Sequence, residues 1–568
     1  MPTKTWTGAG VNNNWNTALN WSGGTVPASG DDIIFDGAFP ITGVKNCTLN
    51  VGFGAASFTF TSGYTGTFTF GAALSITSGT LTLGTNTTYT TTGTPTSFTL
   101  TILGVAPGIV SNGKILPVNL FTNMTGGNVL TLTGNADFEG NFLTASTSHS
   151  IKAATLTTVD LRIGGNITVQ AMATNATDHV TIKGYGTAKT FSSGGGLNSN
   201  MRVSFVSGST YTSAASSSST GASFLTVEPG GQFNAVSTHT FNGSATLSGF
   251  NSTNNSDFFA LFGFTLTINT DIVVKSFINI TTATSSIVSS GSSKLLLEGN
   301  LVASSTATTI IDKLEFSGTT ASNITAVTSS NLQVREFIIN KTGGGSVNFN
   351  SNGFFGLFVP SGSSYSFVHT SGIVTQNSTC IVRFWCNNAA STMTYSQTGL
   401  TFRDLQFLGG VLNLNSQLLA NTLRITPQGV ATVTSITSST TFGFNVENLL
   451  VLNASGAARP ITLKSTVVYD VTVSLIMMTT SAAATVTLNA SSVGVRAIFN
   501  LSNSATQTVE YVNATDIDSS GTGGVLPYSK QTIYSFAGVI APTTINWGSG
   551  TQPPPLAITR TVAHTFVN

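Results

Sequence analysis

Paired carboxylates are the residues whose types and spacing come closest to doing chemistry. Asp137 with Glu139, and Asp516 with Asp518, are two positions apart, so each pair would share one face of a strand. Two carboxyl groups that flank the scissile bond are what glycoside hydrolysis requires. The first pair is flanked by glycines, as in an exposed turn, and the second lies in the expected last coil. We therefore predict no catalytic residues and name Asp137 and Glu139 as the candidates to examine.

Oxygen ligands for a metal are grouped near the start of the chain. Asp31, Asp32 and Asp36 could gather around Ca²⁺, which prefers carboxylate oxygens. No repeated Gly-Gly-x-Gly-x-Asp pattern accompanies them, and no Cys or His lies at the spacing of a zinc site. We predict no bound metal and no cofactor.

Cysteines and clustered phenylalanines are both assigned to the core. The spacing of the second and third cysteines predicts one shared strand face, but at a distance along the strand that excludes a disulfide. The clustered aromatics are expected to stack inside rather than to form a sugar-binding platform. The residues concerned are Cys47, Cys380 and Cys386, and Phe354, Phe355 and Phe358.

Short strands must position these residues, because apolar side chains alternate with Ser, Thr, Asn or single charges through the middle of the chain. Such alternation is typical of a half-buried strand. Leu297, Phe316, Phe337 and Leu357 mark successive apolar pairs at spacings of 19, 21 and 20 residues. Short strands repeated at about 20 residues are the signature of a solenoid. We predict an all-β fold, a single long parallel β-solenoid.

A solenoid also fits the length of 568 residues, because every added coil brings its own core. At about 22 residues per coil and ~4.8 Å between stacked strands, we expect roughly 20 coils in a shaft on the order of 100 Å long. The predicted parts are an N-terminal capping or attachment segment (1–54), the shaft (55–510), a C-terminal capping coil (511–550), and a Pro-rich linker with a terminal strand (551–568).

The charge and hydropathy of the chain limit the kinds of partner that are expected. Charged residues make up 7% of the chain, and the net charge is +1 without any run of Lys or Arg. A nucleic-acid partner is therefore not expected. No run of about 20 apolar residues is present, so no membrane span is expected. The start of the chain has no apolar signal region, which favours assembly in the cytoplasm or export without a cleaved signal.

Tryptophans mark the two ends of the chain. Trp6, Trp15 and Trp21 cluster at the start and Trp547 lies near the finish. Because an open solenoid must cover its terminal coils, we expect these indoles to form caps.

The same two ends carry a family resemblance. Residues 5–36 include Thr5-Trp6-Thr7-Gly8 and Gly30-Asp31-Asp32-Ile33-Ile34-Phe35, and residues 511–547 close at Asn546-Trp547. These segments resemble the ends of β-helical repeat proteins of phage virions and of bacterial autotransporter-associated repeat proteins. The resemblance covers about 70 residues and implies architecture more than function.

The C-terminal tail is expected to join chains together. After Pro553-Pro554-Pro555 come Ile558, Val562 and Phe566, which indicate an extended strand with no local partner. We predict a homo-oligomer, a trimer, with this tail in the contacts between chains. A frayed tail is the alternative.

The sequence favours a non-enzymatic structural protein, a spike, fibre or surface decoration of a phage-like virion that serves attachment or shell stabilisation. Its partners would be other virion proteins or host surface glycans. The alternatives are an adhesin on the bacterial cell surface and a polysaccharide-degrading tailspike.

Overall fold

A computed structural model describes the chain outside residues 1, 39–44, 125–126, 145–149, 171–178, 194–201, 214–216, 221–223, 229–230, 236–238, 243–244, 248–249, 253–257, 263–264, 269, 275–276, 283–284, 290, 304–308, 327–331, 428–433, 454–455, 480–481, 521–531 and 550–568. Strands make up 59% and helix 1%, and the stacked parallel strands form a β-solenoid of about 16 turns. The predicted fold class is confirmed. The chain forms two compact units, Met1–Val302 and Ala303–Asn568.

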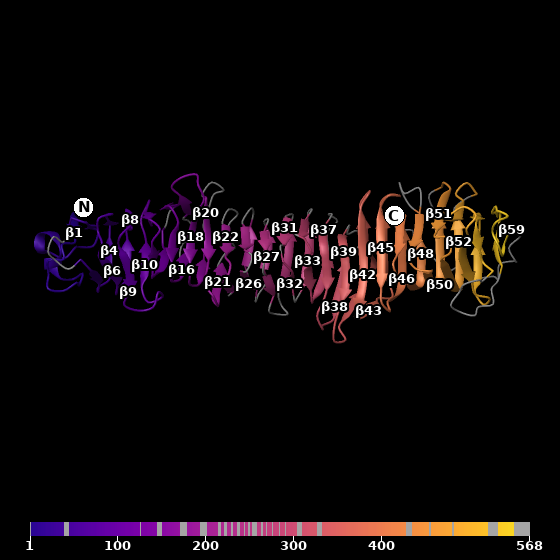
Figure 1. Cartoon of the computed structure of the whole chain (residues 1–568), viewed down its shortest axis with the longest axis horizontal. Coiled ribbons are helices and arrows are strands. Elements are labelled where there is room, and N and C mark those ends of the chain that lie inside the picture. The colour runs from indigo at the N-terminus through magenta and orange to yellow at the C-terminus, as the bar shows by residue number, and fades with distance from the viewer. Residues whose placement is uncertain are drawn as a thin grey trace. The chain divides into compact units, whose positions relative to one another are not determined.

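In unit 1, strands pair in parallel with strands one coil away, and after β1 and β2 these partners are not neighbours along the chain (Figure 1). One ladder contains β1 (Thr3–Thr5), β2 (Asp32–Phe35), β5 (Ser57–Phe60), β8 (Thr80–Thr82), β11 (Gly108–Val110), β14 (Val129–Thr133) and β17 (Ser150–Ala153). A second contains β4 (Phe53–Ala55), β7 (Leu74–Ile76), β10 (Thr99–Ile102), β13 (Asn119–Thr122), β16 (Phe142–Thr144), β19 (Ile167–Val169), β21 (Lys189–Ser193), β23 (Thr210–Ser213), β26 (Gln232–Ala235), β29 (Phe250–Ser252), β32 (Ile272–Val274) and β35 (Leu295–Leu297).

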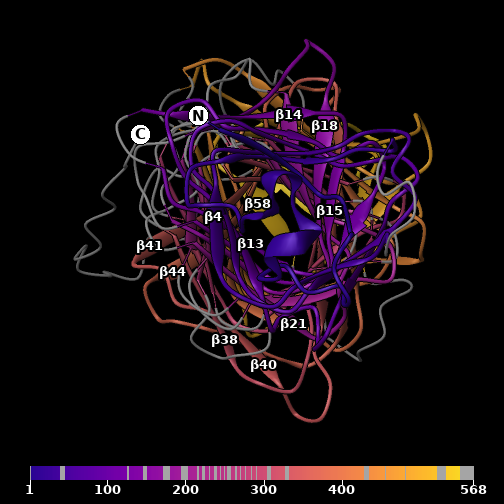
Figure 2. The ribbon, with the colours of Figure 1, turned by 90° about the vertical axis from the view of Figure 1, so that its left-hand side faces the viewer.

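A third ladder of unit 1 contains β12 (Ile115–Leu116), β15 (Ala136–Phe138), β18 (Val159–Ile163), β20 (Val180–Gly184), β22 (Arg202–Phe205), β25 (Phe224–Val227), β28 (Ala245–Leu247), β31 (Thr265–Ile268) and β34 (Ser285–Ser289). Shorter ladders are β3 (Cys47–Leu49), β6 (Thr67–Phe70) and β9 (Thr88–Thr91), and β24 (Ser217–Thr220), β27 (His239–Asn242), β30 (Phe258–Phe262) and β33 (Phe277–Thr282). Strand β36 (Asn300–Ala303) contains the boundary between the units. Viewed from the N-terminal end, the coils of unit 1 wrap around a common interior (Figure 2).

Unit 2 continues the same construction with longer strands. One ladder contains β37 (Thr309–Phe316), β39 (Leu332–Asn340), β42 (Ser364–Ser371), β45 (Thr392–Gln397), β47 (Gly410–Leu414), β49 (Thr434–Ser438), β51 (Arg459–Leu463), β53 (Val486–Ala490) and β56 (Val512–Thr515). A second contains β41 (Gly353–Val359), β44 (Cys380–Cys386), β46 (Thr401–Leu408), β48 (Leu418–Ile425), β50 (Phe442–Asn453), β52 (Val468–Thr479), β54 (Ala497–Leu501) and β57 (Ile517–Asp518). Flanking strands are β38 (Ser322–Ala326), β40 (Ser346–Phe349), β43 (Ile373–Gln376), β55 (Thr506–Val509), β58 (Ile533–Ser535) and β59 (Trp547–Ser549).

Side chains alternate between the interior and the outer face along these strands. In β44 every second residue from Cys380 to Cys386 is buried. Because each coil repeats the previous one, inward aromatic rings stack on their equivalents. The rings of Phe337 and Phe367 lie 5.3 Å apart at an interplanar angle of 10°. Such stacks combine the burial of apolar area with favourable ring geometry.

Coil lengths vary around the period predicted from the sequence. Register partners on adjacent coils are 20 residues apart at Thr99 and Asn119, and 22 apart at Leu120 and Phe142, and other coils are longer. Hydrogen bonds between adjacent coils join residues 25 positions apart at Asp32 and Ser57, and 27 apart at Asn350 and Asn377. Phe337 pairs with Phe367, whereas Leu357 pairs with Leu332. The expected step from Phe337 to Leu357 was therefore wrong, because a turn after Pro360 divides one long strand of the earlier coil into β41 and β42 of the next.

Parallel stacking begins before residue 55. Thr3 pairs with Asp32, and Ile33 pairs with Phe58, so the segment 1–54 contributes strands to the ladder itself. Within the described residues the helices are η1 (Ala18–Asn20) and η2 (Ser22–Gly24), and none has the length and hydropathy to cross a membrane.

Candidate functional site

Asp137, the first catalytic candidate, lies in an ion pair on the outer face of unit 1. Its Oδ2 is 3.1 Å from Arg162 Nη1, and its Oδ1 accepts a hydrogen bond of 2.8 Å from Tyr185 Oη. Burial, followed by the hydrogen bond to Asp137, raises the pKa of Tyr185 and keeps the phenol protonated. The exposed turn predicted for Asp137 is wrong, because it is buried on β15, whereas Glu139 follows the strand and is exposed. The two carboxyl groups therefore have different environments.

Other acids on the outer faces are also paired with the neighbouring coil. Asp160 lies 3.0 Å from Lys183, and Asp312 lies 2.8 Å from Arg335. Glu315 accepts a hydrogen bond of 2.8 Å from Asn340. Acid and base at successive rungs neutralise each other, which is a structural use of charge.

The aspartates of the last coil do not form the pair that their spacing suggested. Asp516 has a φ of 56° and lies between β56 and β57, so the alternation of a strand is broken there. Its carboxylate accepts a hydrogen bond of 2.9 Å from the Gly494 N–H, which lowers its pKa. Asp518 accepts a separate hydrogen bond of 2.8 Å from the Ser520 N–H.

The three aspartates considered for a metal each bind a different protein group. Asp31 accepts from the Ala28 N–H at 2.8 Å, Asp32 from Ser57 Oγ at 2.6 Å, and Asp36 from the Ala38 N–H at 3.1 Å. No group of three or more His, Cys, Asp or Glu that could hold a metal is found among the described residues.

The N-terminal tryptophans are buried together on the first coils. Trp6 stacks on Phe35 at 5.8 Å and Trp15 stacks on Phe58 at 5.8 Å, while Trp21 donates a hydrogen bond of 2.7 Å to the Trp15 carbonyl. Near the other end, Trp547 is buried, and its ring lies 6.1 Å from that of Phe499. A cap requires such packing, and its contribution to stability stays a prediction. Ile558, Val562 and Phe566 lie outside the described residues.

All three cysteines are unpaired and buried. Cys380 and Cys386 face the core of unit 2 from one strand, as their spacing predicted. Burial raises the pKa of Cys386 to about 12 and also raises that of Cys47 and Cys380. Thiols in this state stay protonated and are poor nucleophiles.

The outer face of unit 2 differs from these neutralised clusters. Phe355 is in the core as predicted, but Phe354 and Phe358 lie on the outer face with Gly356 between them. On the next coil, Arg383 pairs in register with Gly356, and Trp385 pairs with Phe358. The Arg383 guanidinium lies 3.4 Å from the centre of the Phe354 ring, and the Phe358 and Trp385 rings are 5.3 Å apart, edge to face. We call Phe354, Gly356, Phe358, Arg383 and Trp385 the arginine–aromatic face.

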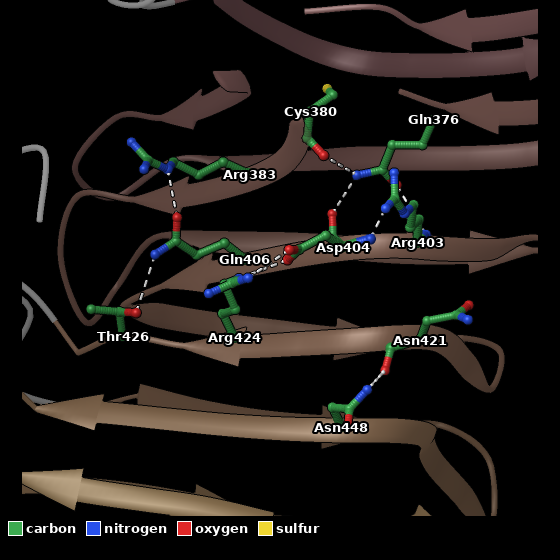
Figure 3. Close-up of polar contacts among 10 residues, drawn as sticks. All are labelled: Gln376, Cys380, Arg383, Arg403, Asp404, Gln406, Asn421, Arg424, Thr426 and Asn448. Atoms are coloured by element: carbon green, nitrogen blue, oxygen red, sulfur yellow. Dashed lines mark hydrogen bonds and ion pairs between the residues drawn. The ribbon is translucent and has the colours of Figure 1, made fainter. Parts of the chain in front are cut away.

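Two further coils extend this face with polar side chains (Figure 3). Arg383 Nε donates to Gln406 Oε1 at 2.9 Å, and Gln406 Nε2 donates to Thr426 Oγ1 at 3.1 Å. Arg424, the register partner of Gln406, binds both oxygens of Asp404 at 2.8 and 2.7 Å. The hydrogen bond to Asp404 raises the pKa of Arg424.

Gln376 fixes the backbone beside Asp404. Its amide nitrogen donates to the carbonyls of Cys380 and Asp404, both at 2.7 Å, and its amide oxygen accepts from the Arg403 N–H at 3.0 Å (Figure 3). On β46, the residues in register with β44 run from Leu405 to Leu408. The Gln376 side chain supplies hydrogen-bond partners for the backbone of Arg403 and Asp404, just before that paired segment. Unpaired buried backbone groups would otherwise destabilise this corner.

Arg383 carries a charge that the fold does not neutralise. Within the described part of the chain no carboxylate contacts it, and no hydrogen bond reaches its two terminal nitrogens. Burial is the cause that lowers its pKa, to about 10, so the group remains charged at neutral pH. This site was not predicted from the sequence, because Phe354, Phe355 and Phe358 were all expected in the core. Phe354 and Phe355 are adjacent on one strand and must therefore point to opposite faces, and this was the signal available in the sequence.

Comparison with known proteins gives no relative for this chain. No protein-family model matches it, and no curated protein or solved structure is similar enough to count as a match. The resemblance of residues 5–36 and 511–547 to virion and autotransporter-associated proteins therefore stays a prediction.

Proposed function

We propose that this chain is a non-enzymatic structural protein, a β-solenoid spike, fibre or surface decoration of a phage-like virion. The observation that carries the proposal is the stacking of parallel coils, in which Asp137, Asp160 and Asp312 each pair with a base one coil away. Such a construction resists deformation because every coil is bound to the next by backbone ladders, core stacks and ion pairs. A stiff body of this kind suits attachment or shell stabilisation.

The proposal includes assembly into a trimer. The last described coil exposes apolar side chains, with Tyr534 44%, Phe536 42% and Val539 71% exposed. We interpret these side chains, which lie close together in the sequence, as an apolar patch of the kind that commonly marks a contact with another protein surface. The tail from residue 551, which lies outside the described residues, contains apolar residues in its sequence and is the proposed partner of these side chains. Other virion proteins remain the further expected partners.

The location of the protein, on virus particles or on the cell envelope, tests the proposed function. Antibodies against the purified full chain should label particles that band with capsids in a density gradient, and labelled particles should lose the signal when the gene is deleted. Labelling confined to the cell envelope would replace the virion proposal with a cell-surface adhesin. Incubation with candidate polysaccharides should release no new reducing ends, and release that Asp137→Asn abolishes would instead indicate a polysaccharide-degrading tailspike.

A further inference from the structure

We propose that the arginine–aromatic face of unit 2 binds an anionic saccharide, with Arg383 holding the acidic group and the aromatic rings holding the sugar. The inference rests on the proposed attachment function and narrows its partner to one chemical class.

The environment of Arg383 differs from that of three other outward arginines. Arg162, Arg335 and Arg424 each contact an aspartate on a neighbouring coil, at 3.1, 2.8 and 2.7 Å. Arg383 instead has a neutral amide on its Nε and a phenyl ring beneath its plane. Removing a cation from water without an opposite charge destabilises the fold, and cation–π contact restores part of that cost. An incoming carboxylate or sulfate would restore more, through two parallel hydrogen bonds to the free terminal nitrogens.

Space for a ligand is present beside the guanidinium. Gly356 is the register partner of Arg383, and a Cβ added at Gly356 would meet no atom within 4 Å. Phe354 and Phe358 border this gap from either side, two positions away along the same strand. A glycine between two outward phenylalanines therefore leaves an open notch on the sheet, with Arg383 on the adjoining coil.

The rings that border the notch favour a sugar over a small inorganic anion. Phe354, Phe358 and Trp385 are all partly exposed, and Phe358 meets Trp385 edge to face. Exposed aromatic surface beside a few fixed polar groups is typical of sites for small ligands. A pyranose ring presents C–H groups to such a surface, while a carboxylate or sulfate on it reaches the guanidinium.

The experiment uses the full-length protein and calorimetric titration with hexasaccharides. The probes are an oligogalacturonate, a sulfated oligosaccharide and the neutral maltohexaose. We expect the anionic probes to bind about tenfold or more tightly than the neutral one, a difference typical of one charge-assisted pair. Comparison of the carboxylated and the sulfated probe identifies which acid the notch prefers.

Two variants and one control locate the site. Arg383→Met removes the charge, and Gly356→Leu fills the notch while leaving the charge in place. Each should weaken anionic binding about tenfold or more. Arg162→Met, on unit 1, should leave binding unchanged. Equal binding of neutral and anionic probes, no binding of any anionic probe, or full binding by Arg383→Met would overturn the inference. These results leave the labelling of particles unaffected, so the two proposals fail separately.

Discussion

The Asp137 cluster of unit 1 and the arginine–aromatic face of unit 2 use the same location, the outer side of a parallel sheet, in opposite ways. In unit 1, Arg162 lies against Asp137 and above the ring of Tyr185, 5.2 Å away. In unit 2, Arg383 lies above Phe354 with no carboxylate beside it among the described residues. A charge that is neutralised within the fold supports the fold, whereas one left without a counterion is available to a ligand.

Unit 2 contains its own internal comparison. Arg383, Gln406 and Arg424 follow one another at adjacent rungs. Arg424 binds Asp404 through two hydrogen bonds, and this interaction outweighs burial and raises the pKa of Arg424, whereas burial alone lowers the pKa of Arg383. The two arginines therefore lie on the same outer face, but only Arg424 has a counterion within the described part of the chain.

The largest expected effect comes from removing the counterion of Arg424. Asp404→Ala should lower the local free energy of unfolding by about 2 kcal/mol, because a partly buried cation loses its partner. Hydrogen exchange of the β46 and β48 amides measures this, since a solenoid opens locally. Asn421→Ala, at an exposed position nearby, is the matched control and should change stability by less than about 0.5 kcal/mol. Equal protection in Asp404→Ala and wild type would contradict the structural role of the pair.

A smaller effect is expected from giving Arg383 the counterion that it lacks. Gln406→Glu should raise local stability by about 1 kcal/mol, because its oxygen already lies at hydrogen-bonding distance from Arg383 Nε. The same change should weaken binding of the anionic saccharide, since the new carboxylate competes for the guanidinium. In an Arg383→Met background the gain in stability should disappear. A gain that persists there would show that Arg383 is not its source.

The buried thiols sharpen the contrast, because a thiol can respond to burial by keeping its proton. The pKa of Cys386 is about 12 in the folded chain, above its unfolded value. Its contribution to stability is therefore complete below the unfolded pKa of about 8.5 and declines as the pH rises from there toward 12. Thermal melting between pH 7 and 10 should show this decline, by less than about 2 kcal/mol for one thiol. Cys386→Ala should make the decline shallower, and an unchanged slope would contradict the assignment.

The architecture could be predicted from the sequence because it depends on a local and repeated pattern. Alternation of apolar and polar residues, as in Cys380 to Cys386, fixes which side chains face inward without knowledge of distant contacts. The coil length was harder to predict, because β39 pairs with both β41 and β42, and successive apolar pairs can belong to different faces of one coil.

The candidate site could not be predicted because its residues meet only across coils. Arg383 lies 27 positions from Gly356 in register, a pairing that depends on the length of the intervening turns. The spacing of Asp516 and Asp518 was misleading for a related reason, since Asp516 itself has a positive φ and separates β56 from β57. The face to which a side chain points can be predicted from odd or even position along its strand. A contact between coils can be predicted only when the pairing register of the two strands is known.

Replacing each arginine with methionine tests most directly whether the fold uses the two charges differently. Hydrogen exchange on Arg383→Met and Arg424→Met, without ligand, compares them two rungs apart on one ladder, with Gln406 between them. Arg424→Met should lower local stability by about 1–2 kcal/mol, because Asp404 loses its partner. Arg383→Met should leave stability unchanged or slightly raised, within about 0.5 kcal/mol, because an uncompensated charge is removed and apolar contact with Phe354 is kept. An equal loss in both variants would contradict the claim that Arg383 is reserved for a ligand.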